Sequence, residues 1–331
     1  YSYSDKVTSD QILLVPVSAA TMFTNRWVNA GTLAGQTHEL AFGAVLMSTA
    51  DRFWRINLTL DRTRQEITAL EGVQPFYGGP DETTAIFRVA PGEKFGVMYG
   101  SRWIRTAEQL ATSLASGQLS GVAGDFRVNE EGYYVRTSTW RTVDERPLKA
   151  YNEDGTSVVQ IGDVNPDFNF ALNSTFQWKG LSLNALVTMV QGGDIYNLTR
   201  QWPFNERRDP VMDQRDKPEI ERKPVTYYQV FYDGINANDY FVEDGSYVRL
   251  RELAINWQLP QSVMQKVAFL NFESARLGIV GRNLWTSTNY SGYDPDVTGT
   301  SGLQGNPFTY RVDYFTYPQY RTFTFMLELG F

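Results

Sequence analysis

The sequence contains no cysteine, which excludes disulfide bonds, thiolate catalysis and cysteine-ligated zinc sites together. It contains one histidine, His38, so a metal site would have to depend on carboxylates. No apolar run approaches the ~18 residues that a membrane-spanning helix needs, so any membrane crossing must use strands. The formal net charge of −7 is opposite in sign to the basic surfaces that bind nucleic acid. We therefore expect no nucleic-acid partner and no metal or other cofactor.

Aromatic residues, at 14%, and 27 glycines are what the sequence has in abundance. Apolar and polar residues alternate with a period of two in many segments, which indicates β-strands, whereas helical periodicity is almost absent. The clearest case is 168–178, followed by Lys179-Gly180 and then 181–190, which predicts a hairpin with a two-residue turn. A short connecting helix is expected at 261–267. The sequence thus predicts an all-β chain.

We expect about nine strands, including one at 95–99, and the spaces between them are unequal. Three spaces are long and rich in Gly, Pro, Asn, Asp and aromatic residues, namely 106–164, 196–238 and 287–318. Loops of this length are unusual inside a compact soluble domain. Counting antiparallel strands backwards from the chain end places all three on one side, as in bacterial outer-membrane barrels with long extracellular loops.

The two faces of the predicted strands differ in character. One face is aliphatic and aromatic over about nine to eleven positions, the length that a tilted strand needs to cross the hydrocarbon layer. The other face carries Asn, Gln, Thr, Ser and Gly with few Lys, unlike the water-exposed face of a β-sandwich. Trp and Tyr fall near strand ends, where an interfacial girdle places them. The pattern favours an antiparallel transmembrane β-barrel, and it leaves a soluble β-sandwich as the alternative.

A longer motif begins at Asp239 and reads DYFVEDGSYVRLRELAINWQLP. This segment resembles the carboxyl-terminal region of SusC/RagA-family TonB-linked outer-membrane proteins, in which such a motif opens a barrel strand that ends in Leu-Pro. Further segments match in the same order: 29–43 (loosely), 161–197, GRNLWTSTNYSGYDPDV at 281–297 and YPQYRTFTFMLELGF at 317–331. The resemblance covers most of the chain.

The resemblance implies a barrel of twenty-two strands, filled by an amino-terminal plug and driven through TonB. It also implies a SusD-like lipoprotein that captures glycans or peptides outside the cell. The sequence starts at Tyr1 without a signal peptide or a plug, so we expect residues 1–331 to be the carboxyl-terminal part of such a receptor. About nine strands cannot close that barrel, and open edges in lipid cost several kcal/mol for each unpaired backbone group. We therefore expect an upstream portion, or another chain, to complete it.

Candidate substrate contacts follow from the polar strand face and from the aromatic loops. The lumen-facing candidates, which would offer neutral hydrogen bonds to a polar substrate, are Asn57, Asn169, Asn173, Gln177 and Asn184. The loop candidates, whose rings could stack on a sugar, are Tyr290, Tyr293, Tyr310 and Tyr314. Internal loop packing is the alternative explanation for these tyrosines.

The lone histidine, the acidic pairs and one highly charged loop do not indicate catalysis. A Ser-His-Asp triad around the lone His38 is not indicated. Among 37 acidic residues, chance pairs such as Asp294 with Asp296 do not indicate a glycosidase, so we expect no enzyme. The loop 206–223 carries equal numbers of acidic and basic residues and is typical of a solvated extracellular segment, with contact to a partner lipoprotein as the alternative.

The sequence therefore predicts a multi-pass outer-membrane importer that takes up a glycan, oligosaccharide or peptide with a SusD-like lipoprotein and the TonB complex. A passive porin and a secreted β-sandwich that binds or hydrolyses glycans are the alternatives. In the last strand, 321–331, the apolar residues are expected to face lipid, and the strand is expected to pair with 272–286. Phe331 is expected to serve as the signal for barrel assembly.

Overall fold

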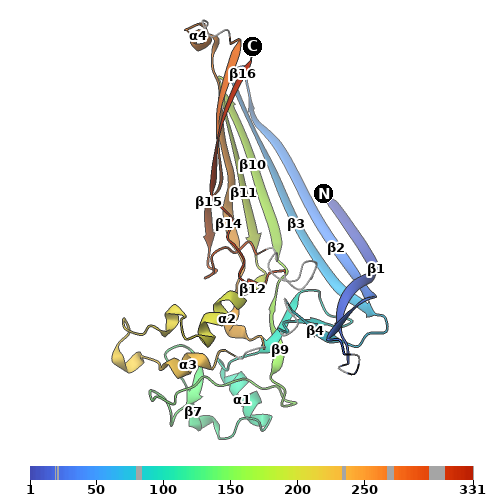
Figure 1. Cartoon of the computed structure of the whole chain (residues 1–331), viewed down its shortest axis with the longest axis vertical. Helices are drawn as coiled ribbons and strands as arrows, with labels where there is room; N and C mark the ends of the chain where they lie inside the picture. The colour runs from blue at the N-terminus through green and yellow to red at the C-terminus, as the bar shows by residue number, and fades with distance from the viewer. Residues whose placement is uncertain are drawn as a thin grey trace.

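The computed structural model describes residues 1–18, 20, 22–79, 84–232, 236–266, 272–297 and 310–330. Eight long strands form one antiparallel sheet (Figure 1). They are β1 (Ser2–Pro16), β2 (Asn25–Ser48), β3 (Arg52–Leu70), β10 (Phe168–Trp178), β11 (Leu181–Gln191), β14 (Tyr247–Gln258), β15 (Ser274–Thr288) and β16 (Thr322–Gly330). Their spatial order is β1-β2-β3-β10-β11-β14-β15-β16. Each strand therefore pairs with the sheet strands that come next to it in the chain, and β1 and β16 are the edges.

The register of the sheet separates an apolar face from a polar one. Directly paired residues share a face, and one row of them runs across six strands. This row consists of Trp54, Phe176, Leu183, Ile255, Ile279 and Phe325. On the opposite face Asn57 pairs with Asn173 and Thr175 pairs with Asn184. The alternation seen in the sequence is thus in phase across the sheet, which gives the sheet one continuous apolar face.

One polar side chain on the apolar face has its own partner. Ser174 lies in line with Leu172 and Phe176 on β10, and its Oγ accepts a hydrogen bond of 3.0 Å from the indole Nε1 of Trp54. A hydroxyl in an apolar environment costs free energy unless it is hydrogen-bonded. The Trp54 indole therefore makes a serine tolerable on this face.

Short turns and long connections lie at opposite ends of the sheet (Figure 1). The β10–β11 turn consists of Lys179 and Gly180, with φ of 47° and 84°, as a two-residue hairpin with the favoured twist requires. The long connections span 71–167, 192–246 and 289–321. All three meet at the end opposite this turn, so the predicted separation of short turns from long loops is confirmed.

The long connections fold together at one end of the sheet. We call this region the loop lobe and define it as the described residues of 71–167, 192–246 and 289–321. Its strands are β4 (Phe76–Gly78), β5 (Phe87–Val89), β6 (Val97–Ser101), β7 (Phe126–Val128), β8 (Tyr134–Arg136), β9 (Val158–Asp163), β12 (Asp194–Tyr196) and β13 (Val242–Asp244). Its helices are α1 (Ala107–Ala115), α2 (Leu198–Asn205) and α3 (Val225–Gln229), with 3₁₀ turns at Ala123–Asp125, Pro210–Met212, Glu219–Glu221 and Asp239–Phe241. Helix α4 (Gln261–Met264) lies between β14 and β15.

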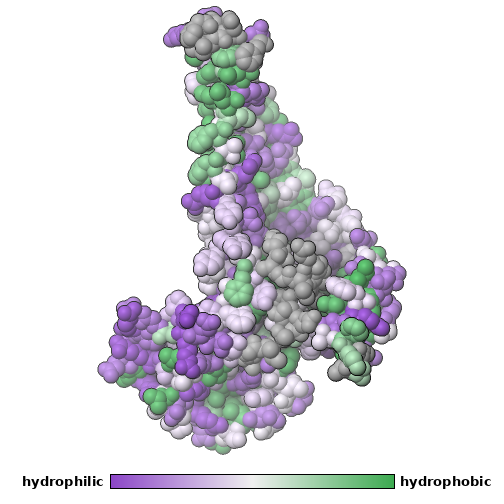
Figure 2. Space-filling model, in the orientation of Figure 1, coloured by the Kyte–Doolittle hydropathy of each residue, from purple (hydrophilic) through white to green (hydrophobic). Residues whose placement is uncertain are grey.

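Most of the buried core lies in the loop lobe, with Leu13, Val15 and Ile67 added by the lobe ends of β1 and β3. Its fully buried members include Ile86, Met98, Phe204, Phe231 and Phe241. The large side chains of the apolar sheet face stay exposed, and Phe325 is 78% exposed. Figure 2 shows apolar residues along the narrow sheet and a mixed, more polar surface over the loop lobe. Among the described residues no second sheet covers the apolar face, so the alternative of a β-sandwich is wrong for this chain.

Two predictions about individual elements need correction. The segment 95–99 alternates like a sheet strand, yet β6 belongs to a small sheet of order β4-β5-β6-β9 in the loop lobe. Val97, Met98, Gly100 and Ser101 are all buried there, so this strand is covered on both sides. Helix α1 was not predicted.

No helix in the described part of the chain is long and apolar enough to cross a membrane.

Candidate functional site

The polar face of the sheet carries a set of linked amide side chains. Asn169 Nδ2 donates to Asp61 Oδ2 at 2.8 Å, and Asn184 Nδ2 donates to Thr175 Oγ1 at 3.2 Å. The Thr175 hydroxyl lies 3.5 Å from Asn173 Oδ1. These groups are half-buried, and each hydrogen bond holds an amide in a defined orientation. An amide side chain offers both donors and acceptors, so this face can exchange hydrogen bonds with a polar solute.

The same face continues toward the short turns and across β14 to β16. Gln177 is exposed and lines an open depression of about 720 Å³ together with Ser182 and Asn256. Farther along, Arg282 Nε contacts Glu252 Oε2 at 3.0 Å. Arg and Glu side chains here neutralise each other, so the face stays polar without a strong net charge.

The EDGS segment of the long motif joins two loops where the sheet meets the loop lobe. Glu243 accepts hydrogen bonds from the Ser291 backbone N–H and from the Ser291 hydroxyl, both at 2.8 Å. It also accepts one from Asn197 Nδ2 at 3.0 Å. Arg311 Nη1 donates to the Gly245 carbonyl at 2.9 Å. The end of the second long connection thus binds its own start, at Asn197, and both the start and the end of the third, at Ser291 and Arg311.

Arg249 of the same motif is 2% exposed and forms an ion pair with Asp294. Arg251 Nη1 lies 2.7 Å from Asp296 Oδ2. Burial opposes ionisation of Asp294, but the hydrogen bond and charge of Arg249 and the backbone N–H groups of Gln319 and Asp296 together lower the pKa of Asp294. Two segments that carry the family resemblance, SYVRLR and GYDPDV, therefore meet in space as a clamp between β14 and the third long connection.

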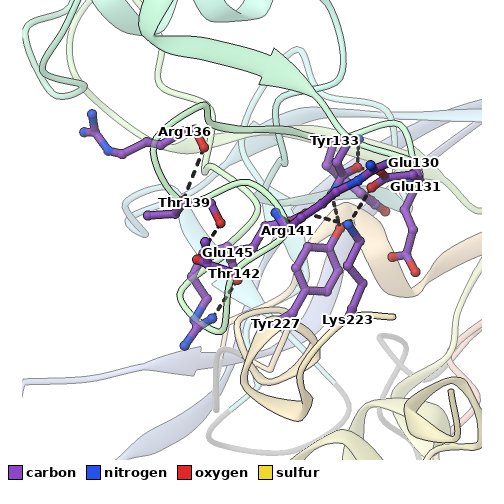
Figure 3. Close-up of polar contacts among 12 residues, drawn as sticks. Glu130, Glu131, Tyr133, Arg136, Thr139, Arg141, Thr142, Glu145, Lys223 and Tyr227 are labelled. Atoms are coloured by element: carbon purple, nitrogen blue, oxygen red, sulfur yellow. Dashed lines mark hydrogen bonds and ion pairs between the residues drawn. The ribbon is translucent and has the colours of Figure 1, made fainter. Parts of the chain in front are cut away.

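A buried ion cluster ties the first long connection to the second (Figure 3). Lys223 is 1% exposed in its side chain, and its Nζ lies 2.6 Å from Glu130 Oε2 and 2.7 Å from Glu145 Oε1. Asn129 Nδ2 donates at 2.9 Å both to Glu145 Oε1 and to Tyr227 Oη. A buried charge needs a partner, and here a cation from one loop and carboxylates from another satisfy each other.

Further contacts surround this cluster. The Arg141 backbone N–H donates to Glu145 Oε2 at 2.7 Å, and Arg141 Nε donates to Glu130 Oε1 at 2.7 Å. Partial burial opposes ionisation of Glu130, but its hydrogen bonds with Lys223 and Arg141 prevail and lower its pKa to about 2. Lys217 lies 2.9 Å from Glu131. The two connections are thus joined by several charge-assisted hydrogen bonds, which are the stronger kind.

No family model matches the chain. Two curated relatives from Formosa agariphila, TonB-dependent receptor P3 and TonB-dependent receptor P26, are 24% identical over 358 and 351 residues and align with 100% of this chain. The chain is a homologue of TonB-dependent receptors. It spans about a third of these relatives, 32% of each. Their names describe receptors and not enzymes. The predicted resemblance to SusC/RagA-family TonB-linked proteins is confirmed.

Solved structures show the fold of this chain. A structure of the RagAB peptide importer in the closed-closed state matches 99% of the chain and 33% of its own length, with a TM-score of 0.65 and 20% identity. A structure of the RagAB peptide transporter matches with a TM-score of 0.63 and 19% identity. The predicted fold class, antiparallel transmembrane strands of a larger barrel with long loops at one end, is confirmed.

The predicted loop tyrosines lie in different environments. Tyr293 is 84% exposed and Tyr310 is 46% exposed, whereas Tyr314 is half-buried against the lobe core. Tyr290 is 5% exposed, and its hydroxyl donates to Asp313 Oδ2 at 2.6 Å. Burial raises the pKa of Tyr290. A buried ring cannot stack on a ligand from solvent, so the prediction for Tyr290 is corrected to internal packing.

Sequence reasoning missed an exposed aromatic pair and misjudged part of one loop. Trp202 and Phe315 are 42% and 53% exposed, with ring centroids 6.2 Å apart. Phe315 has a φ of 54°, an uncommon conformation for a bulky residue, and its N–H donates to Thr199 Oγ1 at 2.7 Å. The loop 206–223 was predicted to be solvated, yet Asp209 and Lys223 within it are buried.

Other predictions stay as they were or fall outside the described residues. Within the described ranges, no group of His, Asp and Glu is placed to hold a metal ion. Asp294 and Asp296 are engaged by arginines, which gives them a structural role. The pairing of the last strand with 272–286 is confirmed by the β15–β16 register. Phe331 lies outside the described residues, and its role in assembly stays a prediction.

Proposed function

We propose that this chain is the carboxyl-terminal barrel portion of an active outer-membrane importer that depends on TonB. The observation that carries the proposal is the two-faced sheet with all its long connections at one end. An apolar face of transmembrane length fits lipid, and long loops at one end fit the extracellular side. Homology to TonB-dependent receptors over the whole chain supports energy-coupled uptake over passive diffusion.

The polar face would line the lumen through which a substrate passes. Asn169, Asn173, Asn184 and the exposed Gln177 present amides that bind polar groups of either hydrogen-bonding sense. Glycans, oligosaccharides and peptides are rich in such groups. The exposed rings of Tyr293 and Tyr310 would add contacts at the entrance. We propose a bulky polar nutrient of this kind as the cargo.

The remaining barrel strands and a plug would come from the rest of the receptor. In the described sheet the outer edges of β1 and β16 have no partner strand. Each unpaired backbone group in lipid costs several kcal/mol, so both edges need a neighbour in the membrane. A barrel portion outside this chain would close the sheet, and the plug would fill the lumen until TonB acts on it.

A SusD-like lipoprotein is the proposed partner on the extracellular side. The loop lobe offers a large folded platform there, and solved structures of the same fold include the RagAB peptide importer. The lipoprotein would capture the nutrient and close over the lobe. Copurification of the full-length receptor with such a lipoprotein, lost when the lobe surface is altered, is the expected result.

Uptake by cells tests the proposed lumen. Asn169, Asn173 and Asn184 are replaced together by Leu in the full-length receptor, and import of a labelled oligosaccharide or peptide is measured. A matched variant carries conservative changes on the lipid face, Leu58→Met and Leu172→Met. We expect the first variant to reach the surface but import slowly, and the second to import normally. Unchanged import by the triple variant contradicts the proposal, and import that persists without TonB indicates a porin.

A further inference from the structure

The outward face of the sheet changes character abruptly on β2 and β3. Leu40 pairs with Leu60, and two residues closer to the loop lobe His38 pairs with Arg62. Directly paired residues share a face and alternate residues stay on it. Leu60 also pairs with Phe170 of the apolar face. His38 and Arg62 therefore lie on the lipid-facing side, directly beyond the apolar belt.

Two tyrosines of β1 complete this cluster. Tyr3 pairs with His38, and the ring centroids of the two lie 5.0 Å apart. The Tyr1 hydroxyl lies 2.7 Å from His38 Nδ1. Tyr1 and Tyr3 are 79% and 50% exposed. The lone histidine of the chain is thus held between two tyrosines on the outer wall of the sheet.

Arg62 is exposed, and it forms no ion pair with any other described residue. Arg64, the next residue on this face toward the loop lobe, does have an ion-pair partner, because Arg64 Nη2 lies 3.6 Å from Asp167 Oδ1. The acidic residue nearest on this face, Asp5, pairs with Gln36 one step farther from the apolar belt. The guanidinium of Arg62 is therefore the available cation at the boundary, and its planar donors suit phosphate oxygens.

The surroundings define what could occupy this site. On the side of the short turns, the cluster is followed by Leu40 and Phe42, which are 48% and 55% exposed. The cluster therefore lies at the membrane boundary on the loop side. Tyrosines favour that boundary, and arginine side chains extend to it. An occupant must present acyl chains to the leucine side and an anion to Arg62. A free phosphate has no acyl chains, and a soluble protein partner does not enter the bilayer, so neither meets both requirements.

We propose that Tyr1, Tyr3, His38 and Arg62 form a headgroup site for a phosphate-bearing lipid of the leaflet on the loop side. Arg62 would contact the phosphate, the tyrosine hydroxyls and His38 would hydrogen-bond its oxygens or an adjoining sugar, and the acyl chains would cover Leu40 and Leu60. The site rests on the transmembrane fold and is independent of the nutrient or of TonB. Its failure would leave the proposed import untouched.

Lipid titration of the purified full-length receptor tests the site. Lipid A with its phosphates, the same lipid without phosphates, and inorganic phosphate are titrated in detergent, and bound lipid is counted by native mass spectrometry. One cation near a phospholipid surface contributes about 1 kcal/mol, so Arg62→Gln should weaken binding of phosphorylated lipid A about fivefold. Arg52→Gln is the matched control, because Arg52 lies on the same face of β3 at the turn end.

The expected result is weaker binding by the Arg62 variant, wild-type binding by the Arg52 variant, and weak binding of dephosphorylated lipid A to every protein. Equal binding by the Arg62 variant and wild type overturns the proposal. So does equal affinity for both lipids, or displacement of bound lipid by inorganic phosphate at low millimolar concentration. Barrel content of each variant, measured by circular dichroism, shows that a loss of lipid is not a loss of fold.

Discussion

Replacing Lys223 by Met should loosen the joint between the first and second long connections. The Lys223 amine is 1% exposed and holds two carboxylates at 2.6 and 2.7 Å. Without it Glu145, which is 0% exposed, keeps only the hydrogen bonds from Asn129 and from the Arg141 backbone. Breaking a buried ion pair by removing one partner costs about 3–5 kcal/mol, because a buried charge is left uncompensated.

Hydrogen exchange of the loop lobe measures this cost locally, since the sheet need not unfold. Peptides covering 126–146 and 214–229 should lose about a hundredfold or more of their protection in the full-length receptor. Lys217→Met is the matched control: Lys217 pairs with Glu131 but is 39% exposed, and exposed pairs contribute up to about 1 kcal/mol. Adding Glu145→Gln to the Lys223 variant should restore part of the protection.

The comparison between the two lysines decides whether this reasoning holds. If Lys223→Met reduces protection no more than Lys217→Met, the buried cluster does not join the loops. A loss confined to 214–229, with 126–146 unchanged, would likewise contradict a shared joint.

Three further predictions concern acid, the motif clamp and the lipid face. The pKa of Glu130 is lowered to about 2, so the stability that its ionised form contributes is complete above its ordinary pKa of 4.5 and is lost as the pH falls toward 2. Hydrogen-exchange protection of 126–146 should decline in that window, and constant protection would refute this. Arg249→Leu should speed proteolysis of the third long connection far more than Arg282→Leu, because Arg249 is buried and Arg282 is 56% exposed; equal rates would count against the clamp. Trp54→Phe should cost about 1 kcal/mol in barrel stability by orphaning Ser174, and adding Ser174→Ala should recover it; no recovery would contradict the pairing.

The sheet could be predicted from the sequence because its signal is local and repeated. In the hairpin 168–190, a period of two and a Lys-Gly turn fix the strands, the turn and the register together. A slip of one residue would move every apolar side chain to the wrong face, so only one pairing fits. The observed register, with Phe176 opposite Leu183, is the one that the alternation requires.

The loop lobe could not be predicted in the same way, because its contacts are long-range. Lys223 meets Glu145 and Glu130 across separations of 78 and 93 residues, and no local pattern distinguishes it from the exposed charges around it. The segment 95–99 alternates but is covered on both sides by the lobe. Burial of Tyr290 depends likewise on Asp313 in another part of its loop.

One helix could have been found from the sequence. Thr106 and Gln109 form a capping box at the start of α1, with the Gln109 N–H donating to Thr106 Oγ1 at 3.2 Å. This spacing of a hydroxyl residue and Gln is a readable signal of a helix start. The surrounding Gly-rich and aromatic residues instead favour a long loop over this segment, which contradicts the local helix signal.

The central claim is that adjacent strand residues face lipid and lumen in turn, and paired cysteine labels test it directly. The chain has no cysteine, so Leu172→Cys and Asn173→Cys each introduce one site, in a full-length receptor freed of any other cysteine. Spin labels at the two positions are compared in lipid bilayers for collision with oxygen and with a water-soluble nickel chelate. We predict that the label at 172 meets oxygen and the label at 173 meets nickel. The same accessibility at both positions would contradict the account.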